Sequence, residues 1–194
     1  GERRSAITGR DTEQDIAPPE RPVNVLLLLL GCDGKVTAGD DTGARAVQAP
    51  KIAINEFLAE NDTVLADEAG EYDDWVEIYN FGDRLVSFDG LYLTDDRDAA
   101  PTQWAFPEGG GLDAGAFALF WCDATASQGP EHASFALEKN GEQLSIFFVE
   151  GGADPVLVDG VDFEVQSPDL SYARVPDGGV DWLRSTPTPN ASNG

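Results

Sequence analysis

The sequence has 194 residues, of which 36 are acidic and 12 are basic, so its formal net charge at pH 7 is −24. A surface this negative repels phosphate backbones and anionic lipid headgroups, which excludes nucleic-acid binding through a basic patch. Most of the charge lies in residues 51–194, which hold 28 acidic and 6 basic residues. Solubility is the simplest reason for such a surface, and an affinity for cations is the alternative.

An apolar run from Val25 to Leu30 is the first distinctive feature along the chain. It is far shorter than the roughly 20 apolar residues that a membrane-spanning helix needs. It resembles the hydrophobic region of a secretion signal that ends in a bacterial lipobox, Leu-x-Gly-Cys, at Leu29 to Cys32. The resemblance implies that Cys32 is lipidated and that residues 1–32 are a signal segment or a disordered leader. The alternative is a strand or short helix that packs on the domain.

Residues 33–50 are small and polar, contain several glycines and have no apolar period. Such composition predicts a flexible tether between an anchor and a folded domain. With Cys32 lipidated, Cys122 would have no partner for a disulfide.

From Lys51 onward, short apolar alternations are separated by Gly, Asp, Asn and Pro, which is typical of strands and turns. We expect seven to nine strands, drawn from 51–59, 74–80, 86–94, 102–106, 116–122, 143–149, 155–163, 171–175 and 181–185. This spacing predicts an all-β domain over residues 51–194, either a two-sheet sandwich or a barrel. Asn140 and Gly141 tolerate the positive φ of tight turns and predict a hairpin at that position.

The stretch DDWVEIYNFGD at residues 73–83 places acids beside aromatic and β-branched residues. In a strand, Val76 and Ile78 share one face while Trp75, Glu77 and Tyr79 share the other. Val76 and Ile78 are therefore the expected core pair. The acids alternate with the core and do not converge on a pocket, so we expect the carboxylates to lie outside in water.

The same stretch, as DWVEIYN, resembles the signature strand of the lamin tail domain family. Further pieces follow in the order of the family: IAINEF at 52–57, GLYLTD at 90–95, WAFPEGGGLDAG at 104–115, FALEKNGEQLSIF at 135–147, SYARVPDGG at 171–179, Trp182, and PTPNASN at 187–193. The resemblance covers residues 51–194 and implies an immunoglobulin-like two-sheet β-sandwich. It also implies an interaction or anchoring module without catalytic residues. Asn190 stands where the family usually has Gly, which is tolerable because Asn adopts the left-handed region more readily than most residues.

Few residues in the sequence suggest catalysis. His132 is the only histidine and lies in a stretch rich in turn residues, which is a poor position for a catalytic triad. Cys122 lies within an apolar strand, where a cysteine is more often a small buried hydrophobe than a reactive thiolate. Two cysteines and one histidine without ligand spacing make a zinc site improbable.

Calcium is the better candidate ligand, because it binds carboxylate and carbonyl oxygens. One dense acidic loop contains Asp95, Asp96 and Asp98, and we take these three as the candidate metal ligands. A second acidic stretch contains further carboxylates, at Glu68, Glu71, Asp73 and Asp74. A solvated acidic loop without an ion is the alternative in both places.

These features together predict a noncatalytic binding or scaffolding module of the bacterial cell envelope, either a membrane-anchored lipoprotein or a secreted protein. Its partner would be an unidentified protein or surface polymer and not a nucleic acid. Membrane contact would depend on lipidation of Cys32. No cofactor is expected, with calcium as a possible exception. The competing hypotheses are an accessory component of an extracellular calcium-dependent hydrolase and a calcium-binding surface protein.

Overall fold

The computed structural model describes residues 49–194. The expected signal segment at 1–32, which includes Cys32, lies outside the described residues. Residues 33–48 of the expected tether at 33–50 lie outside them too. Residues 49–194 contain no helix with the length and apolarity needed to cross a bilayer.

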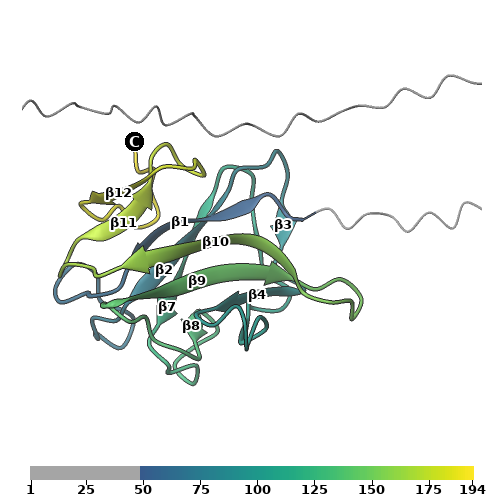
Figure 1. The fold of residues 1–194 in the computed structure, drawn as a ribbon, viewed down its shortest axis with the longest axis horizontal. Coiled ribbons are helices and arrows are strands. Elements are labelled where there is room, and N and C mark those ends of the chain that lie inside the picture. The colour runs from purple at the N-terminus through teal and green to yellow at the C-terminus, as the bar shows by residue number, and fades with distance from the viewer. Residues whose placement is uncertain (1–48) are drawn as a thin grey trace, which may run out of the picture. The chain divides into compact units, whose positions relative to one another are not determined.

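The described residues form an all-β, two-sheet sandwich, which confirms the expected fold class (Figure 1). One sheet has six strands in the order β12-β11-β1-β2-β7-β8, and the second has four in the order β10-β9-β4-β5. A two-stranded sheet pairs β3 with β6. The strands are β1 Ile52–Leu58, β2 Trp75–Asn80, β3 Val86–Ser87, β4 Leu91–Thr94, β5 Trp104–Ala105, β6 Gly111–Leu112, β7 Phe117–Cys122, β8 His132–Ala133, β9 Gly141–Phe148, β10 Val156–Glu164, β11 Ser171–Arg174 and β12 Trp182–Ser185.

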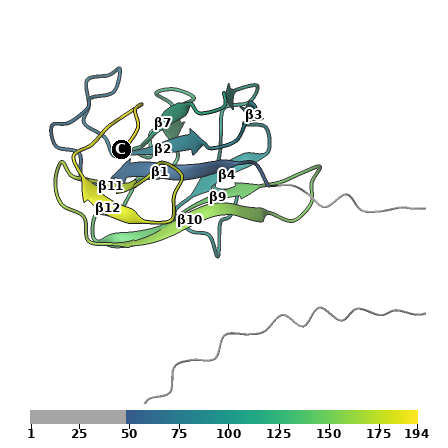
Figure 2. The same ribbon diagram turned by 90° about the horizontal axis from the view of Figure 1, so that it is seen from above.

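The two larger sheets stack face to face, and their inner residues make one apolar core (Figure 2). Val76 and Ile78 of β2 lie fully buried in this core, as their alternation predicts. Aromatic rings fill the space between the sheets, and Phe106 and Phe120 meet edge to face with centroids 4.9 Å apart. Such apolar burial supplies most of the driving force for folding.

A β-bulge in β1 decides which side chains face this core. Ile54 lies opposite Ile78, but Glu56 lies opposite Glu77, so Asn55 is the extra residue. Because the bulge shifts the alternation by one position, Phe57 enters the core and Glu56 turns to the outer face of the sheet. The bulge therefore places two glutamates side by side on that outer face.

An ion pair ties the two sheets together beside β1. Arg174 of β11 donates two hydrogen bonds of 2.9 Å to Asp159 of β10, and Asp159 also accepts a hydrogen bond from the Ile54 backbone. The guanidinium carbon of Arg174 lies 4.5 Å from the ring centroid of Trp182. Both bonds to Asp159 come from Nη2, while Nε and Nη1 donate to the Ile54 and Gly179 carbonyls, so every nitrogen of the guanidinium has an acceptor.

Two local predictions were wrong. The expected strand at 86–94 is divided into β3 and β4, which belong to different sheets, because the chain turns at Gly90 with φ of 78°. The expected hairpin at Asn140 and Gly141 is only a turn, closed by the hydrogen bond from the Gly141 backbone to Glu138. The following strand β9 pairs with β10 and β4. Strands β6 and β8 were not predicted, since two residues carry no period.

Candidate functional site

The loop predicted to bind calcium follows β4 and is tied to the sandwich by its own arginine. Asp96 accepts a hydrogen bond of 3.0 Å from the Ala99 backbone, and Arg97 forms an ion pair with Asp162 of β10. The carboxylates of Asp95, Asp96 and Asp98 are not among the sets of the described residues whose oxygens converge within 4.8 Å. Calcium binding by this loop stays a prediction.

The carboxylates that do converge lie in two other connections, which we call the acidic loop pair. One is the β1–β2 connection at 59–74, and the other is the β7–β8 connection at 123–131. Two side-chain contacts join them, one from Gln128 to Glu71 and one from His132 to Glu68. Residues far apart in the sequence thus come together at one end of the sandwich.

His132, at the start of β8, is fully buried between two carboxylates. Its Nδ1 lies 2.7 Å from Asp123 Oδ2, and its Nε2 lies 2.9 Å from Glu68 Oε1. Burial alone lowers the pKa of His132, but the hydrogen bonds to Asp123 and Glu68 outweigh it and raise the pKa above its ordinary value. Because each ring nitrogen already faces a carboxylate oxygen, neither nitrogen has an open position toward a substrate.

Asp67 forms the centre of the β1–β2 connection. Its side chain has one oxygen in use: Oδ1 accepts hydrogen bonds of 2.9 Å from the Ala69 backbone and 2.7 Å from the Glu71 backbone. The backbone of Asp67 also donates to the Glu71 carbonyl, so residues 67–71 fold back on themselves. Gly70 makes this possible with φ of 85°. Oδ2, the other oxygen, is buried and has no hydrogen-bond donor among the described residues.

Two more buried oxygens of the acidic loop pair lack a donor among the described residues, Asp73 Oδ2 and Gln128 Oε1. The ligand oxygens of Asp67, Glu71 and Asp73 lie within 4.8 Å of one another. Burial raises the pKa of Asp73, and the charges of Asp123, Asp67 and Glu71 raise it further. These oxygens are hard ligands of the kind that a divalent cation prefers.

No lysine or arginine of the described residues forms an ion pair with the converging carboxylates. Lys139 reaches the β1–β2 connection only at Glu60, and the other ion pairs of those basic residues lie elsewhere: Asp83–Arg84, Arg97–Asp162 and Arg174–Asp159. Among the described residues, His132 is the only group that can pair as a cation with carboxylates here, namely Glu68 and Asp123. Asp67, Glu68 and His132 form the second converging set. In this set, His132 Nε2 and Glu68 Oε1 are already hydrogen-bonded to each other.

A second group of buried acids lies on the outer face of β1 and β2, where Glu56 and Glu77 are both fully buried. The expectation that the carboxylates lie in water is therefore wrong for these two residues and for Asp67. The reason is that residues 186–194, which we call the tail, cover this face of the sheet. Asn190 within the tail has φ of 60°, which confirms the expected left-handed conformation.

The tail satisfies these two carboxylates with backbone donors. The Thr188 backbone donates to Glu56 Oε1 at 3.1 Å, and the Asn190 backbone donates to Glu77 Oε2 at 2.5 Å. Asn55 completes the network, because its Nδ2 donates to Glu77 at 3.2 Å and to Asp177 at 3.1 Å. Burial raises the pKa of Glu77 to about 7 and also raises that of Glu56.

Sequence reasoning missed both the tail network and Asp67. The pairing of Glu56 with Glu77 depends on the bulge, which no alternation reveals. One available signal was the tail itself, TPTPNASNG, which is rich in residues that cap and bridge backbone groups.

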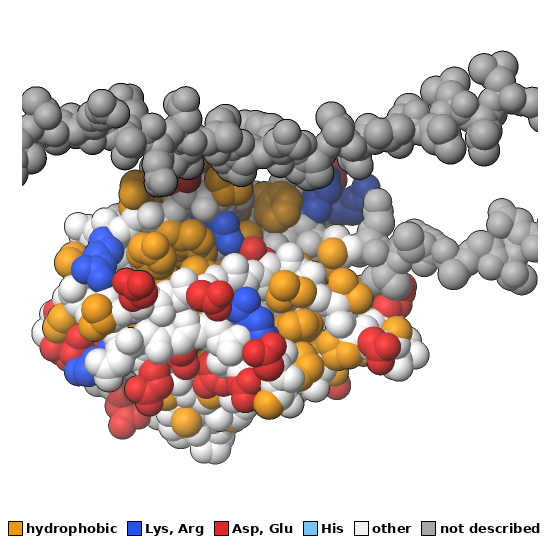
Figure 3. All heavy atoms as spheres, in the orientation of Figure 1, with side chains coloured by type: hydrophobic (Ala, Val, Ile, Leu, Met, Phe, Trp, Pro, Cys, Tyr) orange, Lys and Arg blue, Asp and Glu red, His pale blue; other side chains and the backbone are white. Residues whose placement is uncertain are grey.

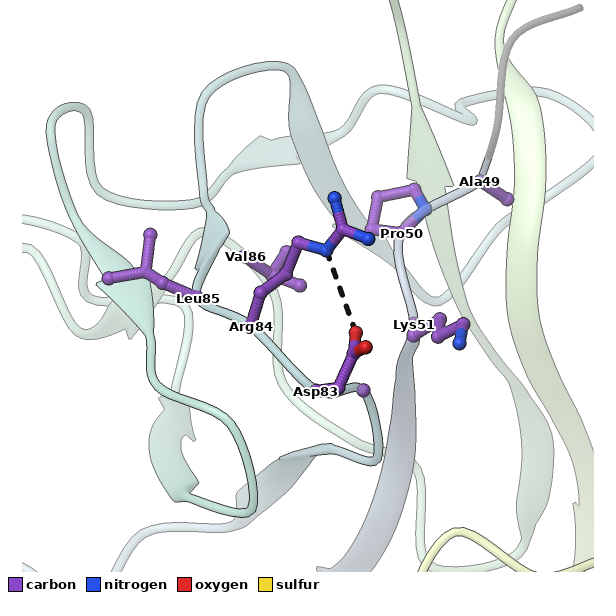
Figure 4. Close-up of a pocket in the computed structure, with 8 residues that line it drawn as sticks. Ala49, Pro50, Lys51, Asp83, Arg84, Leu85 and Val86 are labelled. Carbon is purple, nitrogen blue, oxygen red and sulfur yellow. Dashed lines mark ion pairs between the residues drawn. The ribbon is translucent and has the colours of Figure 1, made fainter.

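A surface hollow lies where the described chain begins (Figure 4). Ala49, Pro50 and Lys51 line one side of it, and residues 82–86 line the other. Its ion pair, Arg84 Nε to Asp83 at 3.5 Å, is almost fully exposed and so contributes little.

Cys122 of β7 is a free, buried thiol, as expected. Burial, with the charges of nearby carboxylates such as Asp74, raises the pKa of Cys122 well above its ordinary value. It is therefore an unreactive part of the core.

Comparison with protein-family models, with curated proteins and with solved structures found no match. The resemblance to the lamin tail domain stays a prediction.

Proposed function

We propose that this chain is a noncatalytic binding or scaffolding module of the bacterial cell envelope, anchored as a lipoprotein through Cys32. The lamin-tail-like motifs and the lipobox-like segment support this proposal from the sequence. The two-sheet sandwich is compatible with it, although a fold of this type hosts many functions.

The observation that carries the noncatalytic part is the environment of His132. A histidine that acts as a general base needs one nitrogen free to accept a proton. Here Asp123 orients one nitrogen, as in a catalytic triad, but the second nitrogen meets the Glu68 carboxylate where a triad would place its nucleophile. His132 therefore joins two loops and has no open side toward a substrate.

The partner would be an unidentified protein or surface polymer with positively charged groups, since residues 51–194 carry far more acidic than basic residues. Acidic side chains are spread over the face that Figure 3 shows, among few basic ones. Duplex DNA is disfavoured by the same charge, and a clear mobility shift at low salt would contradict this part of the proposal.

The anchoring part is tested by expressing the full chain with its own N-terminal segment in a bacterium that processes lipoproteins. Mass spectrometry should find a mature chain that begins at a diacylglycerol-modified Cys32, and the Cys32→Ala variant should leave the membrane fraction. An unmodified Cys32 with residues 1–31 still attached would end the lipoprotein proposal.

The noncatalytic part is tested with a panel of ester, peptide, glycoside and phosphoester substrates. We expect no turnover by the wild-type chain. A turnover that Asp123→Asn and His132→Gln abolish, while both variants stay folded by circular dichroism, would show that the histidine is catalytic.

The second candidate function is calcium binding at the surface. The convergence of Asp67, Glu71 and Asp73 is the observation that favours it.

A further inference from the structure

We propose that Asp67, Glu71, Asp73 and Gln128 bind one calcium ion that joins the two connections of the acidic loop pair. This site differs from the predicted loop at Asp95, Asp96 and Asp98. The proposal rests on the second candidate function, calcium binding, and gives it a site; it is independent of the binding role, because it holds whether or not the module has a macromolecular partner.

One oxygen of a buried carboxylate, Asp67 Oδ2, is unused by the described residues. Only 8% of the surface of Asp67 is exposed, and its Oδ2 has no donor among the described residues. A buried acceptor without a partner costs free energy, and native proteins avoid that cost with a donor, a water molecule or a cation. Asp67 Oδ2 belongs to the most buried carboxylate of the proposed site.

Three carboxylates of this connection, Asp67, Glu71 and Asp73, converge within the span of one ion. Calcium binds oxygens at about 2.3–2.6 Å, so two ligands on opposite sides of one ion lie about 4.6–5.2 Å apart. The ligand oxygens of Asp67, Glu71 and Asp73 lie within 4.8 Å of one another, which matches the spacing around a single ion.

Hydrogen bonds within the protein already orient Asp67 and Gln128. Asp67 uses Oδ1 for two backbone donors and leaves Oδ2 open. Gln128 donates from Nε2 to Glu71 Oε2 at 2.6 Å, so its own Oε1 is left as an acceptor without a donor. Hydrogen bonds that fix one atom of a ligand and leave the next free are typical of a preformed metal site.

Calcium fits this ligand set better than other common divalent ions. All the open atoms are carboxylate or amide oxygens, which are hard ligands that suit calcium. Zinc would require nitrogen or sulfur, but both nitrogens of His132 are engaged by carboxylates, and Cys122 is buried in the core. Magnesium prefers a smaller octahedral shell that retains several waters.

The position of the site indicates what the ion would do. Asp67, Glu71 and Asp73 lie between β1 and β2, whereas Gln128 lies between β7 and β8. An ion bound by all four would therefore hold two separate connections together, beside the link already made by His132 and Glu68.

Isothermal titration calorimetry of the full chain, after removal of divalent ions with a chelator, tests the proposal. We expect one calcium ion per chain, with a dissociation constant of about 0.1–1 mM, as in extracellular calcium modules. Asp67→Asn should weaken binding at least about tenfold, and Gln128→Ala should weaken it less because a neutral ligand is lost. Magnesium should bind more weakly than calcium.

The matched control is the triple variant Asp95→Asn, Asp96→Asn and Asp98→Asn, which removes three carboxylates of another acidic loop. Its calcium affinity should stay within about threefold of wild type, since the general electrostatic attraction is all that it loses. Circular dichroism of each variant shows whether it is folded. If Asp67→Asn is unfolded, Gln128→Ala decides the question.

The proposal is overturned by absence of saturable heat at 10 mM calcium, by tighter binding of magnesium, or by loss of binding in the triple variant alone. Equal affinity of wild type, Asp67→Asn and Gln128→Ala overturns it too. None of these results depends on a protein partner or on lipidation of Cys32, so they leave the proposed binding role intact.

Discussion

Two groups of carboxylates are removed from water in this sandwich by different means. Glu56 and Glu77 lie under the tail, where backbone and side-chain donors from the same chain reach their oxygens. Asp67 and Asp73 lie in a loop connection, where each keeps one buried oxygen that no described residue reaches. The difference teaches that burial of an acid alone says little about function, whereas the number of oxygens left without a donor points to a ligand.

The largest expected effect comes from removing a hydrogen-bond donor from the carboxylates that the tail covers, Glu56 and Glu77. Asn55→Ala removes a donor from Glu77 and Asp177 while the tail remains in place. Because Glu77 Oε1 then loses its donor while buried, and only Oε2 keeps the Asn190 backbone, we expect the free energy of unfolding at pH 8 to fall by about 3 kcal/mol. Urea unfolding measures it, with exposed Asn140→Ala as the control that should change it by less than about 0.5 kcal/mol. Equal losses in both variants would show that the network is not needed.

The next largest effect is expected at His132, which contacts Asp123 and Glu68 beside the loop carboxylates. His132→Phe removes both ring donors and leaves Asp123, whose side chain is only 2% exposed, without its partner. We expect a loss of about 2 kcal/mol at pH 6. A raised folded pKa stabilises the protein below the unfolded pKa of about 6.5, and this stabilisation disappears as pH rises through the folded value.

The pH dependence of this loss checks the assignment of charge. Unfolding of wild type and His132→Phe should differ more at pH 6 than at pH 9. A difference that grows with pH would mean that the ring is neutral in the folded protein and that Glu68 does not receive a hydrogen bond from an imidazolium.

A smaller effect is the pH dependence of stability that arises from Glu77, which distinguishes the carboxylates under the tail from those of the loops. The pKa of Glu77 is raised to about 7, so the folded state binds a proton more tightly than the unfolded state does. For a carboxyl group this means stability that is present at low pH and lost as pH rises from about 4.5 to 7. The full shift overstates the effect because the protein relaxes around a buried charge, so we expect about 1–2 kcal/mol.

Comparison with Glu77→Gln isolates that contribution from all other carboxylates. The stability of wild type relative to the variant should decrease by about 1–2 kcal/mol between pH 5 and pH 8, measured by urea unfolding. An increase would indicate that the tail donors, and not burial, dominate the pKa of Glu77.

The smallest effect concerns Asp83, a carboxylate that stays in water and therefore needs neither donors from the tail nor a cation. Asp83 pairs with Arg84 at the exposed hollow of Figure 4. Arg84→Ala should change the free energy of unfolding by less than about 0.5 kcal/mol, and added salt should make this change smaller. A larger loss would show that the exposed ion pair matters to the fold.

Sequence reasoning succeeds here where a side chain's role depends on near neighbours. The alternation in β2 places Val76 and Ile78 in the core correctly, and the apolar context of Cys122 predicts a buried thiol. Asn190 is also correctly expected in the left-handed region, since that preference is local.

Sequence reasoning fails where segments distant in the chain come into contact. Glu77 and Asn190 are separated by 113 positions and Gln128 and Glu71 by 57, so no local pattern connects them. The division between β3 and β4 follows from Gly90, where a Cβ atom would lie 2.5 Å from the Val149 carbonyl oxygen. That close approach belongs to the packed fold and is invisible in the composition of the strand.

The bulge at Asn55 could be removed without turning β1 over. With Asn55 deleted, Ile54, Glu56 and Phe57 would still face Ile78, Glu77 and Val76 in a regular ladder, so Phe57 would stay in the core and Glu56 on the outer face. The strand would lose the amide that donates to Glu77 and Asp177 and accepts from the Gly178 backbone. A chain shortened by this one residue should therefore keep its sandwich but hold the tail more loosely.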